Sequence, residues 1–224
     1  MFTALLVYLV DTVLASNDAY ASKVFKDYLN TCFSINDLGP LKYFLGIEVA
    51  QGSEEMFLCQ WKYTLEIIDE YGLLGAKPVD LPITENHKLV LATERVLDDA
   101  TRYRRLVGKL IYVTISRPEL TYAVHILSQF MQSSKEDHVK RVLHYLKGTA
   151  GESIFLHTND FLQLYGFCDS DWGACSLLRR SVTGYFMTLR SSPISWRTKK
   201  QAMVSRSLAK AEYMAMAVAN SNLI

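Results

Sequence analysis

The stretch that decides the fold runs from residue 162 to residue 185 and reads LQLYGFCDSDWGACSLLRRSVTGY. Residues 162–168 alternate as a β-strand does, with successive side chains on opposite sides. Asp169 and Asp171 follow this strand, and two residues apart on an extended chain they face the same side. Like charges this close repel each other unless a cation lies between them. The pair therefore suggests a weak magnesium site with oxygen ligands; the alternative is a solvated Asp-Ser-Asp turn.

Three further motifs follow in order. They are RRSVTGY at residues 179–185, ISWRTKKQ at residues 194–201 and AEY at residues 211–213. Together with CDSDWGAC at residues 168–175, they closely resemble the ribonuclease H segment of copia-type LTR retrotransposon Pol polyproteins, particularly those of plants. Four motifs in this order and spacing make a specific signal, and it guides the interpretation of the whole chain.

The resemblance implies which residues form the catalytic site. Ribonucleases H of this family cleave the RNA of an RNA–DNA hybrid with two metal ions held by four carboxylates. Asp169 matches the first of these ligands and Glu212, on an expected helix, matches the second. The motifs that carry the other two have no match in this sequence. Two ligands would hold Mg²⁺ only weakly, because the ion keeps its own water shell, so we expect an incomplete, inactive site.

Composition sets broad limits. The 224 residues suffice for one large or two small domains, and a net charge of +1 gives no global attraction to nucleic acid. Cys32, Cys59, Cys168 and Cys175 show no metal-binding spacing, so we expect free, mostly buried thiols in a reducing, intracellular compartment. The apolar opening lacks a basic flank and a cleavage site, so it does not predict a signal peptide. No apolar run reaches the length of a membrane span.

Residues 4–14 (ALLVYLVDTVL) predict a buried strand or a hairpin around Asp11. This stretch resembles the palm hairpin of copia-type reverse transcriptases, LLVYVDD, whose two Asp residues carry the polymerase metals. Aligned without gaps, Val10 replaces the first Asp and Asp11 matches the second. An alignment shifted by one puts Asp11 first and Thr12 second. Either way one carboxylate is lost, so we interpret Asp11 as the remnant of a polymerase site that no longer works.

The next hundred residues alternate between helical and extended patterns. An N-cap at Asn17-Asp18 opens an amphipathic helix, and residues 42–50 and 56–60 form a hairpin through Gly52-Ser53. A second amphipathic helix is expected at Trp61–Leu74, and residues 84–98 form the expected linker. The hairpin resembles the palm-to-thumb region of the same polymerases.

The chain is then expected to be helical from Tyr103 to Arg117, with an apolar face of Leu106, Leu110 and Val113. Basic residues lie on the rest of this helix or directly before it, namely Arg102, Arg104, Arg105, Lys109 and Arg117. They either follow a phosphate backbone or form a solvated face. Further helices are expected at 120–131 and 138–148, the latter closed by Gly148 as its C-cap. This block resembles the thumb and connection of the family.

Residues 162–168, 181–190 and 194–199 predict an antiparallel three-stranded meander, and residues 207–219 predict a helix. The order strand-strand-strand-helix is how a ribonuclease H fold begins. Four basic residues flank the meander, and they either contact substrate phosphates or are charges that protect strand ends: Arg179, Arg180, Lys199 and Lys200.

These patterns together predict an α+β chain. We expect a reverse transcriptase palm remnant at 1–60, a helical thumb and connection region at 61–158, and the N-terminal half of a ribonuclease H-like domain at 159–224. The resemblance implies a retrotransposon-derived fragment without activity of its own. One alternative is a piece of a working polymerase and ribonuclease H; another is a nucleic-acid-binding remnant. The family's cofactor is Mg²⁺ and its partners are RNA–DNA hybrids or DNA, with no membrane.

Overall fold

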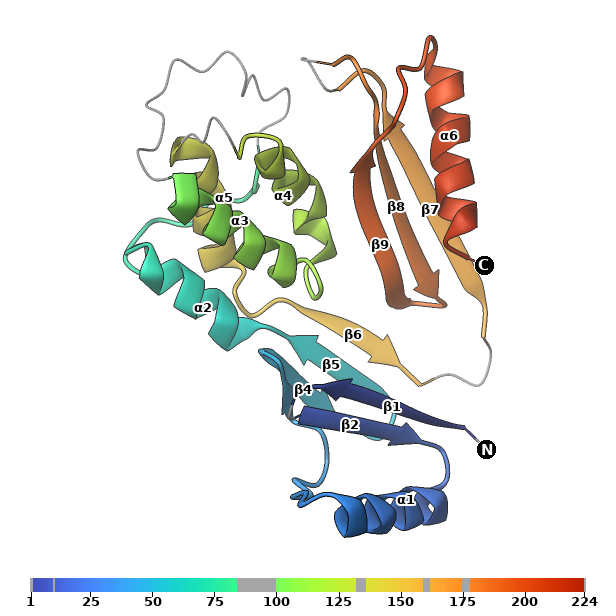
Figure 1. The fold of residues 1–224 in the computed structure, drawn as a ribbon. Coiled ribbons are helices and arrows are strands. Elements are labelled where there is room, and N and C mark those ends of the chain that lie inside the picture. Colours follow the sequence, from blue (N-terminus) through green and yellow to red (C-terminus); the bar gives the residue numbers. More distant parts are fainter. Residues whose placement is uncertain are drawn as a thin grey trace. The chain divides into compact units, whose positions relative to one another are not determined.

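A computed structural model describes residues 2–9, 11–83, 100–131, 136–158, 162–174 and 178–223 (Figure 1). Three earlier predictions fall outside these residues: the linker at 84–98, the substitution at Val10 and the thiol of Cys175. The chain divides into two compact units, Met1–Leu45 and Gly46–Ile224. Helices and antiparallel strands both occur, so the expected α+β class is confirmed.

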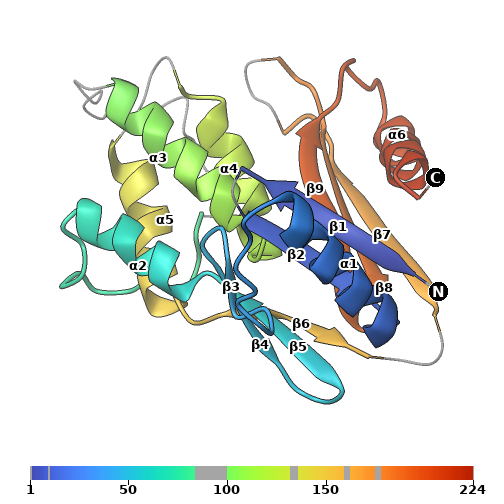
Figure 2. The ribbon, with the colours of Figure 1, turned by 60° about the horizontal axis from the view of Figure 1, so that its bottom comes forward.

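The first unit is a hairpin with one long helix. Strands β1 (Thr3–Tyr8) and β2 (Asp11–Ser16) pair antiparallel, and helix α1 (Ala19–Cys32) packs against β2 (Figure 2). Asp18 caps α1 as predicted, because its Oδ1 accepts a hydrogen bond from the Ala21 amide at 2.9 Å. The short strand β3 (Tyr43–Phe44) follows.

The hairpin around Asp11 was predicted correctly, but its burial was not. Every residue of β1 is exposed. The physical reason is that β1 and β2 make a sheet of two strands by themselves and α1 packs against β2, so little of the side-chain surface of β1 is covered within the described residues. A run of apolar residues predicts a strand, whereas burial depends on what packs against it.

A three-stranded antiparallel arrangement opens the second unit. Strands β4 (Ile47–Gln51) and β5 (Glu55–Cys59) form the predicted hairpin, and β5 also pairs with β6 (Ser153–His157). The strand expected at residues 42–50 is divided into β3 and β4. The reason is a turn at Leu45 and Gly46, whose φ angles of 51° and 87° are incompatible with a strand. Strand β6 was not predicted from the sequence.

Helices of the second unit pack into one apolar core. They are α2 (Trp61–Glu70), α3 (Ala100–Val113), the 3-10 turn η1 (Pro118–Leu120), α4 (Thr121–Ser128) and α5 (Glu136–Gly148). The predicted apolar face of α3 is confirmed, since Leu106, Leu110 and Val113 are buried in this core. Helix α2 ends before the predicted Leu74. Gly72 takes a φ of 66°, and the Leu73 amide donates to the Ile68 carbonyl at 3.0 Å, which closes the helix.

Gly148 lies within α5 and is not the predicted left-handed cap, because its φ is not positive. A Cβ at this position would lie 3.0 Å from the Cβ of Pro78. The glycine is therefore explained by the close approach of the Pro78 segment to the helix.

The last part of the chain is the predicted meander and helix. Strands β7 (Leu164–Asp171), β8 (Val182–Leu189) and β9 (Ser192–Lys200) form an antiparallel sheet in this order. Helix α6 (Leu208–Ser221) covers one face of the sheet, with Ala219 packed against Tyr185 and Met187 (Figure 1). Strand β7 lies slightly later in the sequence than predicted, so both Asp169 and Asp171 belong to it.

Two tryptophan side chains form hydrogen bonds between separate segments of this unit. Trp196 on β9 donates its Nε1 hydrogen to the Thr114 carbonyl after α3, at 2.8 Å. Trp172, directly after β7, donates to the Ser205 carbonyl ahead of α6, at 3.0 Å. The third tryptophan, Trp61, is exposed at the start of α2. None of the helices described has both the length and the apolar character of a membrane span.

Candidate functional site

The candidate carboxylates Asp169 and Asp171 belong to the last three residues of β7, which ends at Asp171. Both side chains are exposed, whereas Ser170 between them is buried. This alternation confirms that the two carboxylates share one side of the strand. In the sheet, Asp169 lies opposite Gly184 and Asp171 lies opposite Val182 on β8.

Gln201 connects the segments that carry Asp169 and Glu212. Its Nε2 donates to the Ser170 and Thr183 hydroxyls at 3.2 and 3.0 Å, and to the Ala211 carbonyl at 2.9 Å. Its Oε1 accepts from the Ser205 hydroxyl at 3.1 Å. Gln201 is 5% exposed, so its amide is satisfied by protein groups rather than by water. Ser170 follows Asp169 in sequence and Ala211 precedes Glu212.

This role of Gln201 was not anticipated. The motif ISWRTKKQ was recognised from the sequence, but only its basic residues were given a possible function. A glutamine that ends a strand after two lysines gives no sign of burial in the sequence. The burial of Gln201 follows only from the packing of β7, β8 and α6 around its side chain.

Glu212 lies on α6, half-buried, next to Ala211, whose side chain faces the sheet. Carboxylate oxygens such as those of Asp169 and Glu212 are the ligands that Mg²⁺ prefers. Within the described part of the chain, however, no three His, Cys, Asp or Glu side chains are grouped as a metal site. Asp169 and Glu212 therefore stay a predicted pair of metal ligands, and no larger group of such side chains accompanies them in the described part of the chain.

Asp171 accepts a hydrogen bond from helix α4 of the same unit. The hydroxyl of Tyr122, on α4, donates to Asp171 Oδ2 at 3.2 Å. Burial raises the pKa of Tyr122 to about 12, and the negative charge of Asp171 adds to this shift. The phenol therefore keeps its proton at neutral pH and remains a donor to the carboxylate.

The predicted basic face of α3 is partly neutralised. Arg105 Nη2 lies 3.0 Å from Glu70 on α2, and Lys109 forms a second ion pair with the same carboxylate. The hydrogen bond from Lys109 is the main reason why the pKa of Glu70 lies below its usual range. Arg104 is exposed. Arg105 and Lys109, both predicted as nucleic-acid contacts, thus have an acidic partner within the chain.

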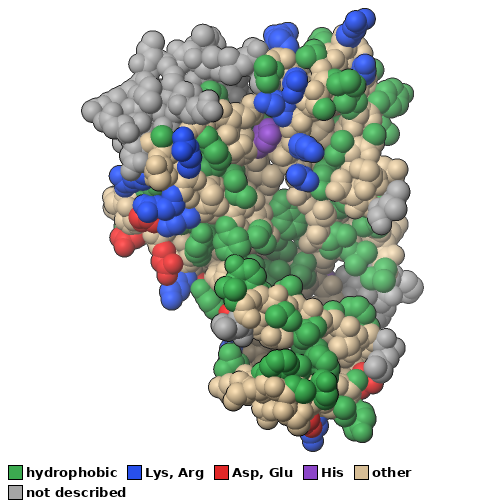
Figure 3. Space-filling model, in the orientation of Figure 1, with side chains coloured by type: hydrophobic (Ala, Val, Ile, Leu, Met, Phe, Trp, Pro, Cys, Tyr) green, Lys and Arg blue, Asp and Glu red, His purple; other side chains and the backbone are tan. Residues whose placement is uncertain are grey.

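The predicted basic residues of the meander lie at its ends. Lys199 is exposed and Lys200 half-buried on β9, while Arg179 and Arg180 precede β8. Arg197, two residues before Lys199, is also exposed. Figure 3 shows Lys and Arg side chains gathered near a histidine on this face. The charge of Lys200 also acts on His125 on α4: burial, and secondarily this charge, lower the pKa of His125.

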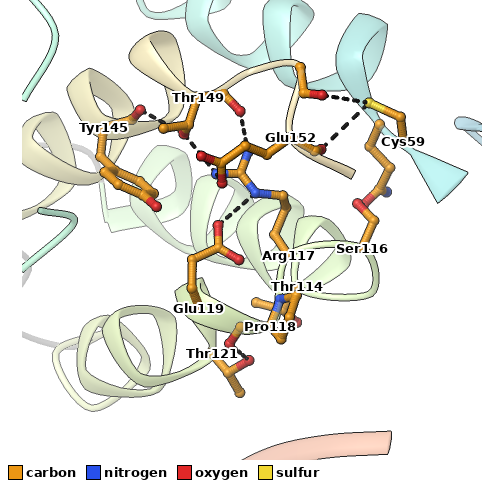
Figure 4. Close-up of polar contacts among 12 residues, drawn as sticks. Cys59, Thr114, Ser116, Arg117, Pro118, Glu119, Thr121, Tyr145, Thr149 and Glu152 are labelled. Carbon is orange, nitrogen blue, oxygen red and sulfur yellow. Dashed lines mark hydrogen bonds and ion pairs between the residues drawn. The ribbon is translucent and has the colours of Figure 1, made fainter. Parts of the chain in front are cut away.

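Arg117 was expected among the exposed basic residues, and this expectation was wrong. Its side chain is 3% exposed, because the chain turns inward after α3. Nε donates to Glu119 at 2.6 Å, Nη1 to the Thr149 carbonyl at 2.8 Å and Nη2 to Glu152 at 3.1 Å (Figure 4). The guanidinium also lies 5.8 Å from the centre of the Tyr145 ring. Arg117 is a structural junction and not a nucleic-acid contact.

Asp11, the predicted polymerase remnant, is the first residue of β2 and is exposed, opposite Tyr8. Among the cysteines, Cys32, Cys59 and Cys168 are free as expected. Burial was predicted incorrectly for Cys32, which is exposed at the end of α1, while Cys59 and Cys168 are half-buried. Burial raises the pKa of the Cys59 thiol.

Comparison with known proteins gives the family. A family model described as reverse transcriptase (RNA-dependent DNA polymerase) matches residues 3–85. An uncharacterized mitochondrial protein of Arabidopsis thaliana is 37% identical over 222 residues, which cover 98% of this chain and 92% of that protein. The Pol polyprotein of the Arabidopsis transposon RE2 is 40% identical over 222 residues. The chain belongs to the copia-type retrotransposon Pol family.

This Pol-family chain matches only a small part of the full polyproteins. It spans 15% of the RE2 polyprotein and 18% of the Pol polyprotein of the tobacco transposon TNT 1-94, to which it is 30% identical over 235 residues. No solved structure matches the chain.

Proposed function

We propose that the chain is a retrotransposon-derived segment that joins the later part of a reverse transcriptase to the first half of a ribonuclease H fold, and that it is catalytically inactive by itself. Its proposed parts are a palm remnant at 1–60, a thumb and connection region at 61–158 and the ribonuclease H-like half at 159–224. The observation that supports this proposal is the hydrogen bonding of Gln201. Its buried side-chain amide donates to Ser170, next to Asp169, and to Ala211, next to Glu212.

The expected inactivity follows from the ligand count. Polymerases and nucleases of this type use two metal ions, which several carboxylates must hold at once. At the polymerase hairpin, Val10 stands where the family has its first Asp. At the proposed ribonuclease H site, Asp169 and Glu212 supply two ligands, with Asp171 as a weaker third that Tyr122 already engages. Mg²⁺ bound by such a pair would remain largely hydrated.

Cleavage of an RNA–DNA hybrid in Mg²⁺ tests the proposal. We expect no cleavage by the folded chain alone. Fused to the remaining ribonuclease H segment of an RE2-type polyprotein, it should cleave the RNA strand. Asp169→Asn and Glu212→Gln should each abolish this activity, while Asp171→Asn should retain most of it. Cleavage by the unfused chain that is lost in Asp169→Asn would show that it is active. A folded fusion that fails to cleave would disprove the ribonuclease H assignment.

A second candidate function, binding of nucleic acid without catalysis, is favoured by Arg197 and Lys199, which are both exposed on β9. Filter binding of an RNA–DNA hybrid at several salt concentrations tests it. Each phosphate contact contributes roughly 0.9 to the slope of log affinity against log salt. The double substitution of Arg197 and Lys199 to Ala should therefore reduce the slope by about 2. Arg105→Ala is the matched control, since Arg105 is paired with Glu70.

A further inference from the structure

Hydrogen bonds between buried polar groups form a closed ring at the end of β7. Gln201 Nε2 donates to the Ser170 hydroxyl at 3.2 Å, and Gln201 Oε1 accepts from the Ser205 hydroxyl at 3.1 Å. The Ser205 carbonyl accepts from Trp172 Nε1 at 3.0 Å, and Trp172 is two residues after Ser170 in the chain. We call these four residues, Ser170, Trp172, Gln201 and Ser205, the Gln201 ring. It holds the chain directly after Asp169 from two sides.

Three side chains of the ring are buried: Ser170 is 4% exposed, Ser205 is 3% exposed and Gln201 is 5% exposed. A buried hydrogen bond adds little net stability, because it replaces a bond to water. A buried network whose members are all satisfied, however, holds the surrounding segments in a single arrangement. The Gln201 ring is therefore suited to fixing the geometry of β7 and α6 more than to adding stability.

An amide suits the position of Gln201 because it donates at one end and accepts at the other. The Ala211 carbonyl can only accept, so the amide nitrogen faces it, at 2.9 Å. The amide oxygen is then placed to receive the hydroxyl of Ser205. A methionine of similar length could fill the same space but would form neither bond. Through this amide, the end of β7 and the start of α6 are held at a fixed separation.

We propose that Gln201 is a positioning residue of the ribonuclease H-like site, which keeps Asp169 and Glu212 at the separation at which both can bind one metal ion. Its hydrogen bonds go to Ser170 and Ala211, so it acts through the neighbours of the two carboxylates. The inference rests on the proposed function, which supplies this ligand pair. Loss of a group that orients metal ligands typically costs roughly tenfold to a hundredfold in metal affinity or activity.

The experiment compares Gln201→Met with Met187→Ala in the full chain. Met187 is buried against α6 towards the other end of β8, so Met187→Ala is a control that destabilises the same sheet outside the ring. Urea unfolding measures the loss of stability in each variant, and water-proton relaxation measures the binding of Mn²⁺. Gln201→Met should weaken Mn²⁺ binding by about tenfold, whereas Met187→Ala should leave it unchanged.

Two further measurements support this comparison. Ser205→Ala removes the donor to Gln201 Oε1 and keeps the rest of the ring, so it should weaken Mn²⁺ binding less than Gln201→Met. It provides the test if Gln201→Met does not fold. In the fusion that completes the ribonuclease H segment, Gln201→Met should lower kcat by about tenfold and leave KM nearly unchanged, because Gln201 is buried and does not contact the hybrid.

Failure of this inference is distinguishable from failure of the proposed function. If Asp169→Asn weakens Mn²⁺ binding but Gln201→Met and Ser205→Ala do not, only the positioning role of Gln201 is disproved. An equal loss of binding in Met187→Ala also disproves it, because the effect would then follow from stability alone. If neither Asp169→Asn nor Glu212→Gln weakens Mn²⁺ binding, the ligand pair itself is wrong, and the proposed function fails together with this inference.

Discussion

At the scale of single residues, Arg117 shows how much one side chain can organise. Its guanidinium joins η1 through Glu119, the end of α5 through Thr149 and the start of β6 through Glu152. Next to it, the Ser116 hydroxyl donates to Gln60 at 2.7 Å, which brings in the junction of β5 and α2. The helices and the β4–β5–β6 strands therefore meet around one buried cation. Such a cation is stable only while its partners are in place.

We predict that Arg117→Ala lowers the free energy of unfolding by about 3 kcal/mol, because it leaves the Thr149 carbonyl and two carboxylates without their cation. Arg105→Ala is the control: Arg105 is exposed and paired at the surface, so its loss should cost less than about 1 kcal/mol. Urea unfolding measures both. Equal effects of the two substitutions would contradict the structural role of Arg117.

We predict that His125 makes stability depend on pH. Burial lowers its pKa in the folded protein below the usual 6.5, with a smaller effect from Lys200. The unfolded chain therefore takes up the proton first, and stability falls as the pH drops from about 6.5 through the lowered pKa. His125→Leu should flatten this dependence between about pH 7 and 5.5. Urea midpoints across this range test the prediction, and parallel curves for both proteins would refute it.

At the scale of elements, two neighbouring glycines give a matched pair. Gly72 has a φ of 66° after α2, whereas the φ of Gly75 is not positive; a Cβ would have open space at both. Gly72→Ala should therefore destabilise the protein by about 1 kcal/mol through backbone strain alone. Gly75→Ala should be neutral or slightly stabilising, since it restricts the unfolded chain. Thermal unfolding compares them, and an equal loss at both positions would argue against strain.

Local sequence patterns predicted where the helices and strands lie better than they predicted what packs against them. Alternation and turn residues placed the β4–β5 hairpin and the β7–β8–β9 meander, and Asp18 placed the start of α1. Strand β6 was missed because its partner β5 lies about a hundred residues earlier in the sequence. Such long-range pairing leaves no local signal. The same limit explains Arg117, whose burial depends on segments more than thirty residues away.

For the candidate site, too, the sequence predicted the positions of residues but not the contacts between elements. The positions of Asp169 and Asp171 on one side of a strand follow from their spacing alone. The bond between Tyr122 and Asp171, the pairing of Arg105 and Lys109 with Glu70, and the buried amide of Gln201 do not. Each depends on how two separate elements pack, which no motif encodes.

At the scale of the whole molecule, the two units differ in how they are stabilised. The second contains the buried cores, whereas no described residue of the first is buried. We predict that the amides of β1, β2 and α1 exchange with deuterium much faster than those of α3 and α5, because local opening costs little where no core holds the element. Exchange followed by mass spectrometry tests this. Equal protection in both units would contradict it.

The placement of the tryptophans has a consequence for optical experiments. Trp61, Trp172 and Trp196 all belong to the second unit, and the chain has three tryptophans in total. Indole emission therefore reports on that unit alone, and a protein whose first unit had melted would still have the spectrum of a folded one. Tyr28→Trp would place a new fluorophore on α1, where Tyr28 is exposed, and its emission would report on the first unit separately.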